Sequence, residues 1–140
     1  MSTSQSTANR NLDDDYGSGT PATIFVCLTT TAPDETGDGS ITQPTGGQYD
    51  TYTEVEIPND STHWPAASAG SKHNGVSFNF PVAGAGSTNN IPLTHIVFRT
   101  AATVDGGGRI IDALPLPAGT VVTIGEAHYF PIGAIVLTES

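Results

Sequence analysis

The chain is poor in cysteine, in basic residues and in long apolar runs, and each shortage excludes a class of protein. Cys27 is the single cysteine, so no intrachain disulfide can form, and its apolar neighbours predict a buried, inert thiol. Only 4 Lys and Arg stand against 14 Asp and Glu, which gives a net charge of −10. Such an acidic chain lacks a phosphate-binding footprint and is repelled by anionic membranes. We therefore expect neither nucleic acid nor a membrane as a partner.

Hydrophobic runs and targeting signals are equally scarce. No stretch of about 18 apolar residues is present, as a membrane-spanning helix would need. The first residues contain neither a basic segment nor the apolar core of a secretion signal. The 140 residues are enough for one domain with one core.

Turn-forming residues are abundant instead. The 16 Gly and 10 Pro, with 13% charged residues, favour many short strands joined by turns. We predict an all-β fold, an antiparallel two-sheet β-sandwich of seven to eight strands, either jelly-roll-like or immunoglobulin-like. The predicted strands are 22–30, 49–57, 74–81, 93–101, 109–114, 120–124 and 126–130, the last continuing over 132–138.

The alternation of apolar residues predicts which side chains form the core. Residues 22–28 are apolar in both phases, as in a strand covered on two sides, whereas 49–57 alternate and should carry Glu54 and Glu56 outward. Asp105-Gly106 predicts a hairpin. The predicted core is Ile24, Val26, Leu28, Val55, Ile57, Val76, Phe78, Phe80, Ile96, Phe98, Ile111, Val122 and Ile124.

The chain divides into an N-terminal arm, residues 1–19, and a β-sandwich domain, residues 20–140. The arm is rich in Ser, Thr and Asn and has too few apolar side chains to pack. We predict that it is flexible alone and orders on an assembled particle or on a neighbouring subunit. Its acidic run, Asp13, Asp14 and Asp15, would then face basic residues of the partner.

Residues capable of catalysis or metal binding do not form a recognisable motif. His63, His73, His95 and His128 lie in four separate segments, and neither Asp13–Asp15 nor Asp34, Glu35 and Asp38 match a calcium loop. Gly106-Gly107-Gly108 precedes a strand and not a helix, so it is no phosphate cradle. We predict no catalytic residue, no metal and no cofactor, and a small β-sandwich enzyme is the weakest reading.

The aromatic residues suggest an interface. Trp64 beside Pro65 in an irregular segment is typical of an exposed anchor for another protein. Together with Tyr49 and Tyr52 it could also form a platform for stacking sugars. We favour protein contact, with Trp64, Pro65, Asp13, Asp14 and Asp15 as interface residues.

Several motifs occur in an order that resembles a family of small structural proteins of tailed bacteriophages, described as capsid decoration or tail-fibre-like proteins. They are Thr20-Pro21-Ala22-Thr23, Gly46-Gly47-Gln48-Tyr49, Val76-Ser77-Phe78-Asn79-Phe80-Pro81, Leu93-Thr94-His95-Ile96-Val97-Phe98 and Leu116-Pro117-Ala118-Gly119-Thr120-Val121. The resemblance covers about residues 20–137. A short amphipathic helix often opens such chains, whereas residues 1–19 here are polar.

The resemblance implies a non-enzymatic virion protein. The first interpretation of the resemblance is a capsid decoration protein. It would be a homo-oligomer, most simply a trimer, bound to the shell of the major capsid protein. It would be made in the host bacterial cytoplasm and located on the capsid surface. The alternative is a tail-fibre-like or receptor-binding module that recognises host surface glycans.

Overall fold

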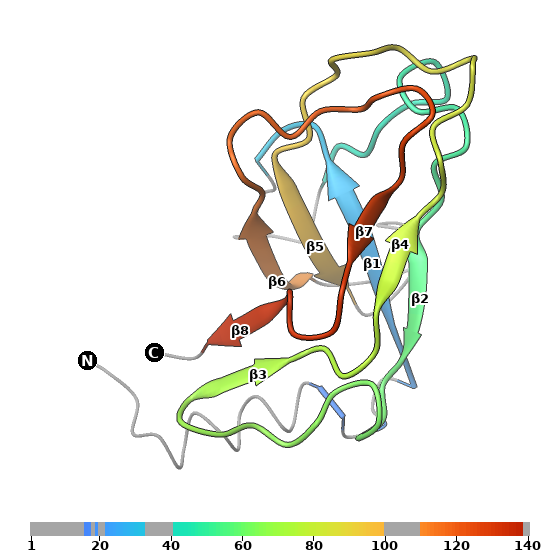
Figure 1. The fold of residues 1–140 in the computed structure, drawn as a ribbon. Helices are drawn as coiled ribbons and strands as arrows, with labels where there is room; N and C mark the ends of the chain where they lie inside the picture. The colour runs from blue at the N-terminus through green and yellow to red at the C-terminus, as the bar shows by residue number, and fades with distance from the viewer. Residues whose placement is uncertain (1–15, 18, 20–21, 33–40, 100–109, 139–140) are drawn as a thin grey trace. The chain divides into compact units, whose positions relative to one another are not determined.

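Eight short strands make up the regular structure of the computed structural model, which describes residues 16–17, 19, 22–32, 41–99 and 110–138 (Figure 1). Helix is absent from these described residues. The strands are β1 (Thr23–Thr29), β2 (Val55–Pro58), β3 (Ser71–His73), β4 (Phe78–Phe80), β5 (His95–Arg99), β6 (Ile110–Pro115), β7 (His128–Phe130) and β8 (Val136–Thr138).

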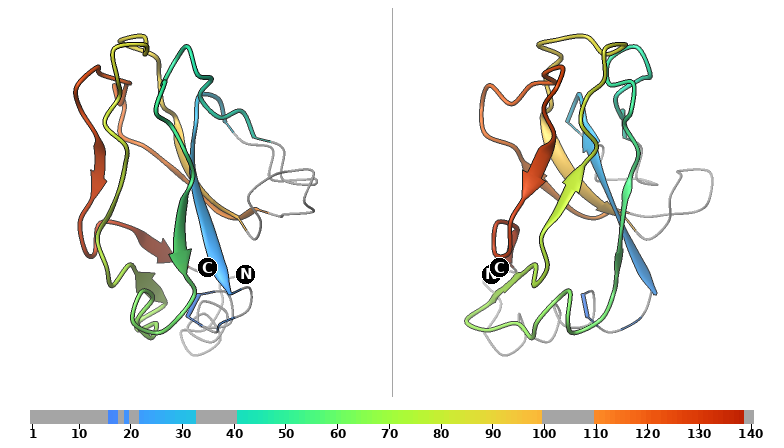
Figure 2. Two further views of the ribbon diagram at one scale, coloured as in Figure 1. Left: turned by 90° about the vertical axis from the view of Figure 1, so that its right-hand side faces the viewer. Right: turned by 45° about the vertical axis from the view of Figure 1, so that its right-hand side comes forward.

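The strands form antiparallel sheets, which confirms the predicted all-β class and the predicted number of strands. One sheet has four strands in the order β2-β1-β5-β6, and two smaller sheets pair β3 with β8 and β4 with β7 (Figure 2). The arrangement is consistent with a sandwich, although the hydrogen-bonded ladders are more divided than two continuous sheets would be. The predicted turn at Asp105-Gly106 lies outside the described residues, but the strands on either side of it, β5 and β6, are paired.

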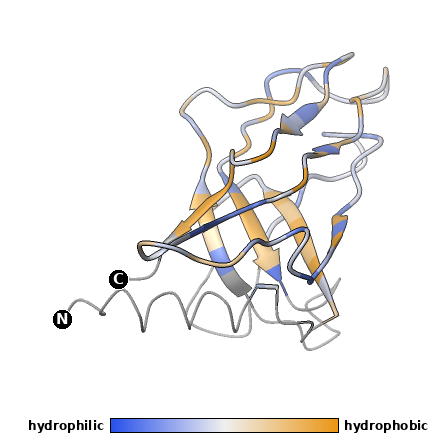
Figure 3. Ribbon diagram, turned by 60° about the horizontal axis from the view of Figure 1, so that its bottom comes forward, coloured by the Kyte–Doolittle hydropathy of each residue, from blue (hydrophilic) through white to orange (hydrophobic). Residues whose placement is uncertain are grey.

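The centre of the four-stranded sheet consists of β1 and β5, which are buried on both faces. Val26 lies opposite Phe98 and Leu28 opposite Ile96 in their register, and all four side chains are buried. Cys27 and Val97 of the other phase are buried as well. The prediction that this apolar run is buried on both faces is therefore confirmed. Hydrophobic colours follow both strands in Figure 3.

Most of the predicted core is confirmed. The buried members are Ile24, Val26, Leu28, Ile57, Phe78, Phe80, Ile96, Phe98 and Val122. Val55 is half-buried, and the side chain of Ile111 lies outside the described residues. Val76 and Ile124 were predicted wrongly, because both are exposed.

Strand boundaries explain these errors. The strand predicted over 49–57 begins only at Val55, because Thr45 O accepts hydrogen bonds from the amides of Gln48 and Tyr49 and closes a turn. The strand predicted over 74–81 is reduced to β4, because the Asn74 side chain bonds the Val76 carbonyl, 3.0 Å, in a turn.

The strand predicted over 120–124 is also absent. Val121 forms only an isolated bridge with Pro92, and Gly125 follows with a φ of 89°. That φ favours glycine and turns the chain. Ile124 consequently faces outward at the turn instead of alternating into a sheet.

The chain divides into two compact units, each described here by itself. The first unit comprises Met1–Ile24, Ile57–Phe78 and Tyr129–Ser140, and the second comprises Phe25–Glu56 and Asn79–His128. Strands β1, β2, β4 and β7 each run through a boundary between these ranges. The predicted division into residues 1–19 and 20–140 stays a prediction, since most of residues 1–19 lie outside the described residues.

Candidate functional site

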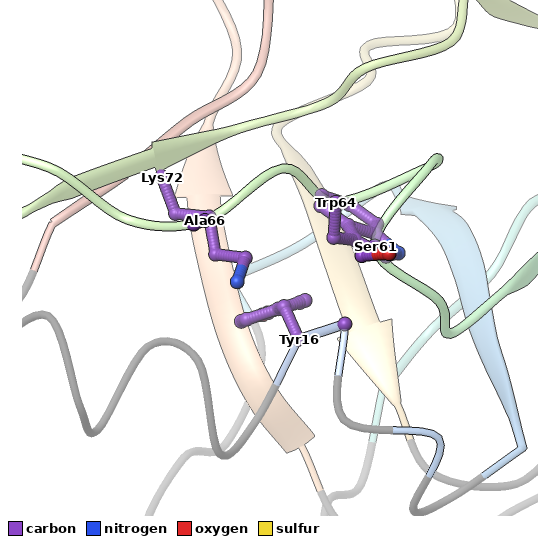
Figure 4. A pocket seen from close by; sticks show the side chains of 6 residues that line it. Tyr16, Ser61, Trp64, Ala66 and Lys72 are labelled. Carbon is purple, nitrogen blue, oxygen red and sulfur yellow. The ribbon is translucent and has the colours of Figure 1, made fainter.

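A small pocket lies in the first unit, beside the point where the described chain begins (Figure 4). Its volume is about 130 Å³, and it is lined by Tyr16, Gly17, Ser61, Trp64, Ala66 and Lys72. The rings of Tyr16 and Trp64 pack with centroids 4.8 Å apart and an angle of 49° between their planes. Both rings are fully buried, and Lys72, which is 2% exposed, directs its amine toward Tyr16 in Figure 4.

Trp64 is held in this place by a turn that Asp60 closes. The Asp60 carboxylate accepts hydrogen bonds from the amide of His63, 2.9 Å, and from its ring nitrogen Nδ1, 2.7 Å. The His63 side chain is the main reason that the pKa of Asp60 is lowered. The Trp64 amide then donates to Asp60 O, 2.9 Å.

Gly75 allows the chain after Trp64 to pack closely against this turn. Its amide donates to His63 O, 2.7 Å. A Cβ at position 75 would lie 2.5 Å from Thr62 O and 2.8 Å from Pro65 Cδ. Only glycine fits there without movement of the backbone.

The predicted role of Trp64 as an exposed anchor is therefore wrong, because the ring is fully buried in the core of the first unit. Pro65 is half-buried and Ala66 is exposed. Asp13, Asp14 and Asp15 lie outside the described residues, so their predicted interface role remains a prediction.

Tyr16 and Gly17 are packed within this unit, whereas residues 1–19 are predicted to order only on an assembled particle or on a neighbouring subunit. Besides the burial of Tyr16, the Gly17 amide donates to Asn59 Oδ1. A Cβ on Gly17 would lie 2.8 Å from Trp64 O, and its φ is 88°. The pocket thus surrounds a buried anchor of the chain that leads into β1, and none of the described residues that line it carries a carboxylate.

A cluster of loops in the second unit is the other candidate, and we call it the loop cluster (residues 45–51, 81–90 and 120–126). Asp50 is its clamp. The Asp50 carboxylate accepts hydrogen bonds from the amides of Gly84, 2.7 Å, and Gly86, 2.9 Å, and from Ser87 Oγ, 2.8 Å. These bonds, that from Ser87 first, lower the pKa of Asp50.

Further bonds join the three loops to one another. Thr51 Oγ1 donates to Val82 O, 2.6 Å, and Thr88 Oγ1 donates to Gly47 O, 2.8 Å. The Ile124 amide donates to Asn89 Oδ1, 2.8 Å. Irregular loops fixed in this way form a defined surface without regular structure, which is common for recognition sites.

The aromatic residues near these loops face inward. Tyr49 is buried and donates its hydroxyl to Pro81 O, and burial raises its pKa to about 12. Tyr52 is half-buried and stacks on Phe80 with centroids 6.0 Å apart. The predicted sugar-stacking platform of Tyr49, Tyr52 and Trp64 is therefore wrong, since none of the three rings is exposed.

A polar network lies inside the second unit, and its presence corrects the prediction that Glu54 is a solvent-facing strand residue. Glu54 Oε1 lies 3.8 Å from a guanidinium nitrogen of the fully buried Arg99 and accepts from Gln43 Nε2, 2.9 Å. Burial is the main reason that the pKa of Glu54 is raised. Gln43 also accepts from the Tyr52 hydroxyl, which in turn accepts from the amide of Leu28, 3.1 Å.

Cys27 lies beside this network, and its predicted burial is confirmed. Its thiol donates to Val97 O, 3.6 Å, and burial raises its pKa to about 12. Such a thiol is unreactive while the fold is intact. The signal for this state was visible in the sequence as apolar residues on both sides of Cys27.

The histidines have separate surroundings. His95 Nδ1 lies 2.9 Å from Thr94 Oγ1, and burial lowers the pKa of His128. Over the described ranges, no three His, Cys, Asp or Glu side chains gather as metal ligands would. The calcium candidates Asp34, Glu35 and Asp38 lie outside those ranges. Nor do the described residues include a helix of the length and apolarity needed to cross a membrane.

Comparison with known proteins gives one family. Among curated proteins, no relative matches the chain. A family model described as "Podophage GP4 fiber I protein gp80" matches residues 3–138, nearly the whole chain. The resemblance to structural proteins of tailed phages is thereby confirmed, and the chain belongs to the podophage GP4 fiber I protein gp80 family.

Proposed function

We propose that this protein is a non-enzymatic component of a fibre on the particle of a tailed phage. The observation that carries the proposal is the family match over residues 3–138, because the family is named for a fibre protein. Capsid decoration, the first reading of the sequence, becomes the second candidate, since the same match supports a virion structural protein of either kind.

The geometry supports a role in contact and not in chemistry. The polar groups of the loop cluster bond one another, as Asp50 does with Gly84, Gly86 and Ser87. Within the fibre role we place recognition of another molecule on this cluster, because preformed loops bind without a large cost of ordering.

The number of copies per particle tests the fibre proposal. Quantitative mass spectrometry of purified particles, with the major capsid protein as internal standard, should give on the order of a dozen copies or fewer for a tail location. Hundreds of copies, together with antibody labelling spread over the shell, would establish decoration instead.

Salt dependence tests what the protein touches. A chain with a net charge of −10 that binds an anionic cell surface works against repulsion, so its binding should strengthen as salt screens the charges. Binding to a basic site on another virion protein should weaken with salt. We expect the first behaviour for purified protein added to host cells.

Two matched variants test the loop cluster. Asp50→Asn and Glu56→Gln each remove one acidic charge, but only Asp50 clamps the loops, whereas Glu56 is exposed on β2. We expect Asp50→Asn alone to weaken binding to cells. Equal effects of both variants would show that charge, and not loop order, controls binding.

A further inference from the structure

The sequence contains a single Asn-Gly pair, Asn74-Gly75, which directly follows β3 in the first unit. Asparagine is a chemically labile residue. It deamidates most readily before glycine, because glycine has no Cβ to keep its backbone nitrogen away from the asparagine carboxamide. Every other asparagine of the chain precedes a larger residue. We therefore expect Asn74 to be the first asparagine to react in an unfolded chain.

Deamidation at this pair needs only water and a base. The Gly75 nitrogen attacks Cγ of Asn74, so that an N–Cγ bond forms and the Cγ–Nδ2 bond breaks. The Gly75 amide proton passes through the solvent to the leaving nitrogen, which departs as ammonia. The resulting succinimide ring adds one water molecule and opens at either carbonyl. The products are aspartate and isoaspartate, and in the latter the main chain runs through the former side chain and is one carbon longer.

The hydrogen bonds of Asn74 in the folded chain oppose this attack. Asn74 Nδ2 donates to Val76 O and to Pro131 O, each 3.0 Å, and Asn74 Oδ1 accepts from the Ile135 amide, 3.0 Å. The attack converts the planar carboxamide to a tetrahedral centre, which cannot keep all three bonds in their present directions. Asn74 is also only 1% exposed, so the water and the base that the reaction needs are kept away from it.

The surroundings of Gly75 act in the same direction and explain why the labile pair is present. The Gly75 amide donates to His63 O, 2.7 Å, and this proton must leave before the nitrogen can attack. A Cβ at position 75 would lie 2.5 Å from Thr62 O. A larger residue, which would slow deamidation, therefore does not fit. The fold thus requires the reactive pair and at the same time protects it.

Neither product of the reaction can replace Asn74. A carboxylate has no donor, and at this buried position it would direct an oxygen at two acceptors, Val76 O and Pro131 O. Isoaspartate would lengthen the main chain just before Gly75 and displace the close packing there. We infer that Asn74 is a deamidation site that the native fold keeps inactive, and that reaction there in an opened chain prevents the first unit from refolding. The inference does not depend on the fibre role, so its failure would leave the proposed function standing.

Peptide mapping by mass spectrometry tests the protection of Asn74. The full-length protein is incubated at mildly alkaline pH with and without guanidinium chloride, and samples are quenched in acid and digested at low pH. We expect Asn74 to deamidate in the denaturant and to react at least about tenfold more slowly in buffer, because only opened molecules react there. Equal rates in the two samples, or an Asn74 that is stable in the denaturant, would overturn the inference.

A matched variant separates the burial of Asn74 from a general effect of folding. Ile91→Gly creates a second Asn-Gly pair at Asn90, which is exposed. In one folded sample of this variant, monitored by circular dichroism, Asn90 should deamidate at least about tenfold faster than Asn74. Equal protection of the two asparagines would show that the burial and the bonds of Asn74 are not the cause, and would overturn the inference.

Refolding tests the consequence of the reaction. The unchanged chain is held in guanidinium chloride until part of it has deamidated at Asn74 and is then diluted into buffer. Size-exclusion chromatography separates refolded from unfolded chains, and Trp64 fluorescence reports the state of the first unit. We expect the refolded fraction to contain intact Asn74, and the aspartate and isoaspartate forms to remain in the unfolded fraction. The same proportion of deamidated Asn74 in both fractions would overturn the inference.

Discussion

The two compact units hold their irregular segments in the same way but differ in charge. In the first unit a buried amide, Asn74, bonds the backbone of two segments, and in the second unit an exposed carboxylate, Asp50, does so. Nine of the 14 acidic residues lie in the ranges of the second unit. In each unit, one polar side chain holds two irregular segments together by hydrogen bonds to their backbone, as ladder bonds hold two strands. A change of pH can break these bonds only at Asp50, because the amide of Asn74 does not titrate.

The largest effects are expected from the cores, and they test whether the units unfold separately. Phe78→Ala in the first unit and Phe98→Ala in the second should each lower the free energy of unfolding by about 3–5 kcal/mol. Trp64 fluorescence reports the first unit, and Cys27 labelling reports the second. Because four strands run through the unit boundaries, we expect both reporters to shift in both variants. A shift confined to the reporter of the substituted unit would show that the two units unfold independently.

A smaller loss is expected from the polar network of the second unit. Glu54→Ala removes the carboxylate beside the fully buried Arg99 and should cost about 3 kcal/mol, because a buried cation loses a partner. Urea unfolding followed by circular dichroism measures it. Glu56→Ala, two residues further along the chain on β2 and exposed to solvent, is the control and should change little.

The next loss of stability in order of size is expected from Asn74, whose side-chain amide bonds two segments of the first unit. Asn74→Ala leaves three backbone groups without the bonds they now make to its side chain, at a cost of about 2 kcal/mol. Hydrogen exchange at Ile135 should accelerate. Asn79→Ala, at an exposed position of β4, should have no such effect, and equal losses from the two would contradict the role of Asn74.

The smallest expected effect is a loss of stability in the loop cluster of the second unit at acidic pH. The folded pKa of Asp50 is lowered from its ordinary value of 3.8, so the stability that it adds is present above that value and is lost as pH falls below it. The protection of the Gly84 and Gly86 amides, which compares their exchange rate with that of an unstructured peptide at the same pH, should decrease below pH 3.8 in the unchanged chain. In Asp50→Asn the protection should already be lower at neutral pH and should lack this acid step. An acid step that survives in the variant would assign it to another group.

Short-range patterns in the sequence were sufficient to predict the sheet centre. Apolar residues in both phases predicted that β1 is buried on two faces, and the same pattern placed Cys27 inside. The family resemblance also followed from the order of short motifs. These features depend on neighbours along the chain, so one sequence contains them.

Burial of the aromatic residues was not predictable in this way. Trp64 and Tyr49 look exposed because Pro, Gly and polar residues surround them, yet both are buried. Their places depend on bonds between distant segments: Asp50 with Gly84 is separated by 34 residues and Asn74 with Pro131 by 57. The sequence marks Asp50 and Asn74 only as polar residues near turns, so neither the loop cluster nor the bonds of Asn74 were predicted.

The uneven distribution of the acidic residues has a consequence for how far assembly can proceed. Wherever copies of this chain stand close together on a particle, each would bring nine acidic residues in the ranges of the second unit, so the repulsion among neighbours would grow with their number. Such repulsion opposes unlimited aggregation of the protein. Ionic strength then becomes a control on assembly size, with larger groups expected as the screening length shortens.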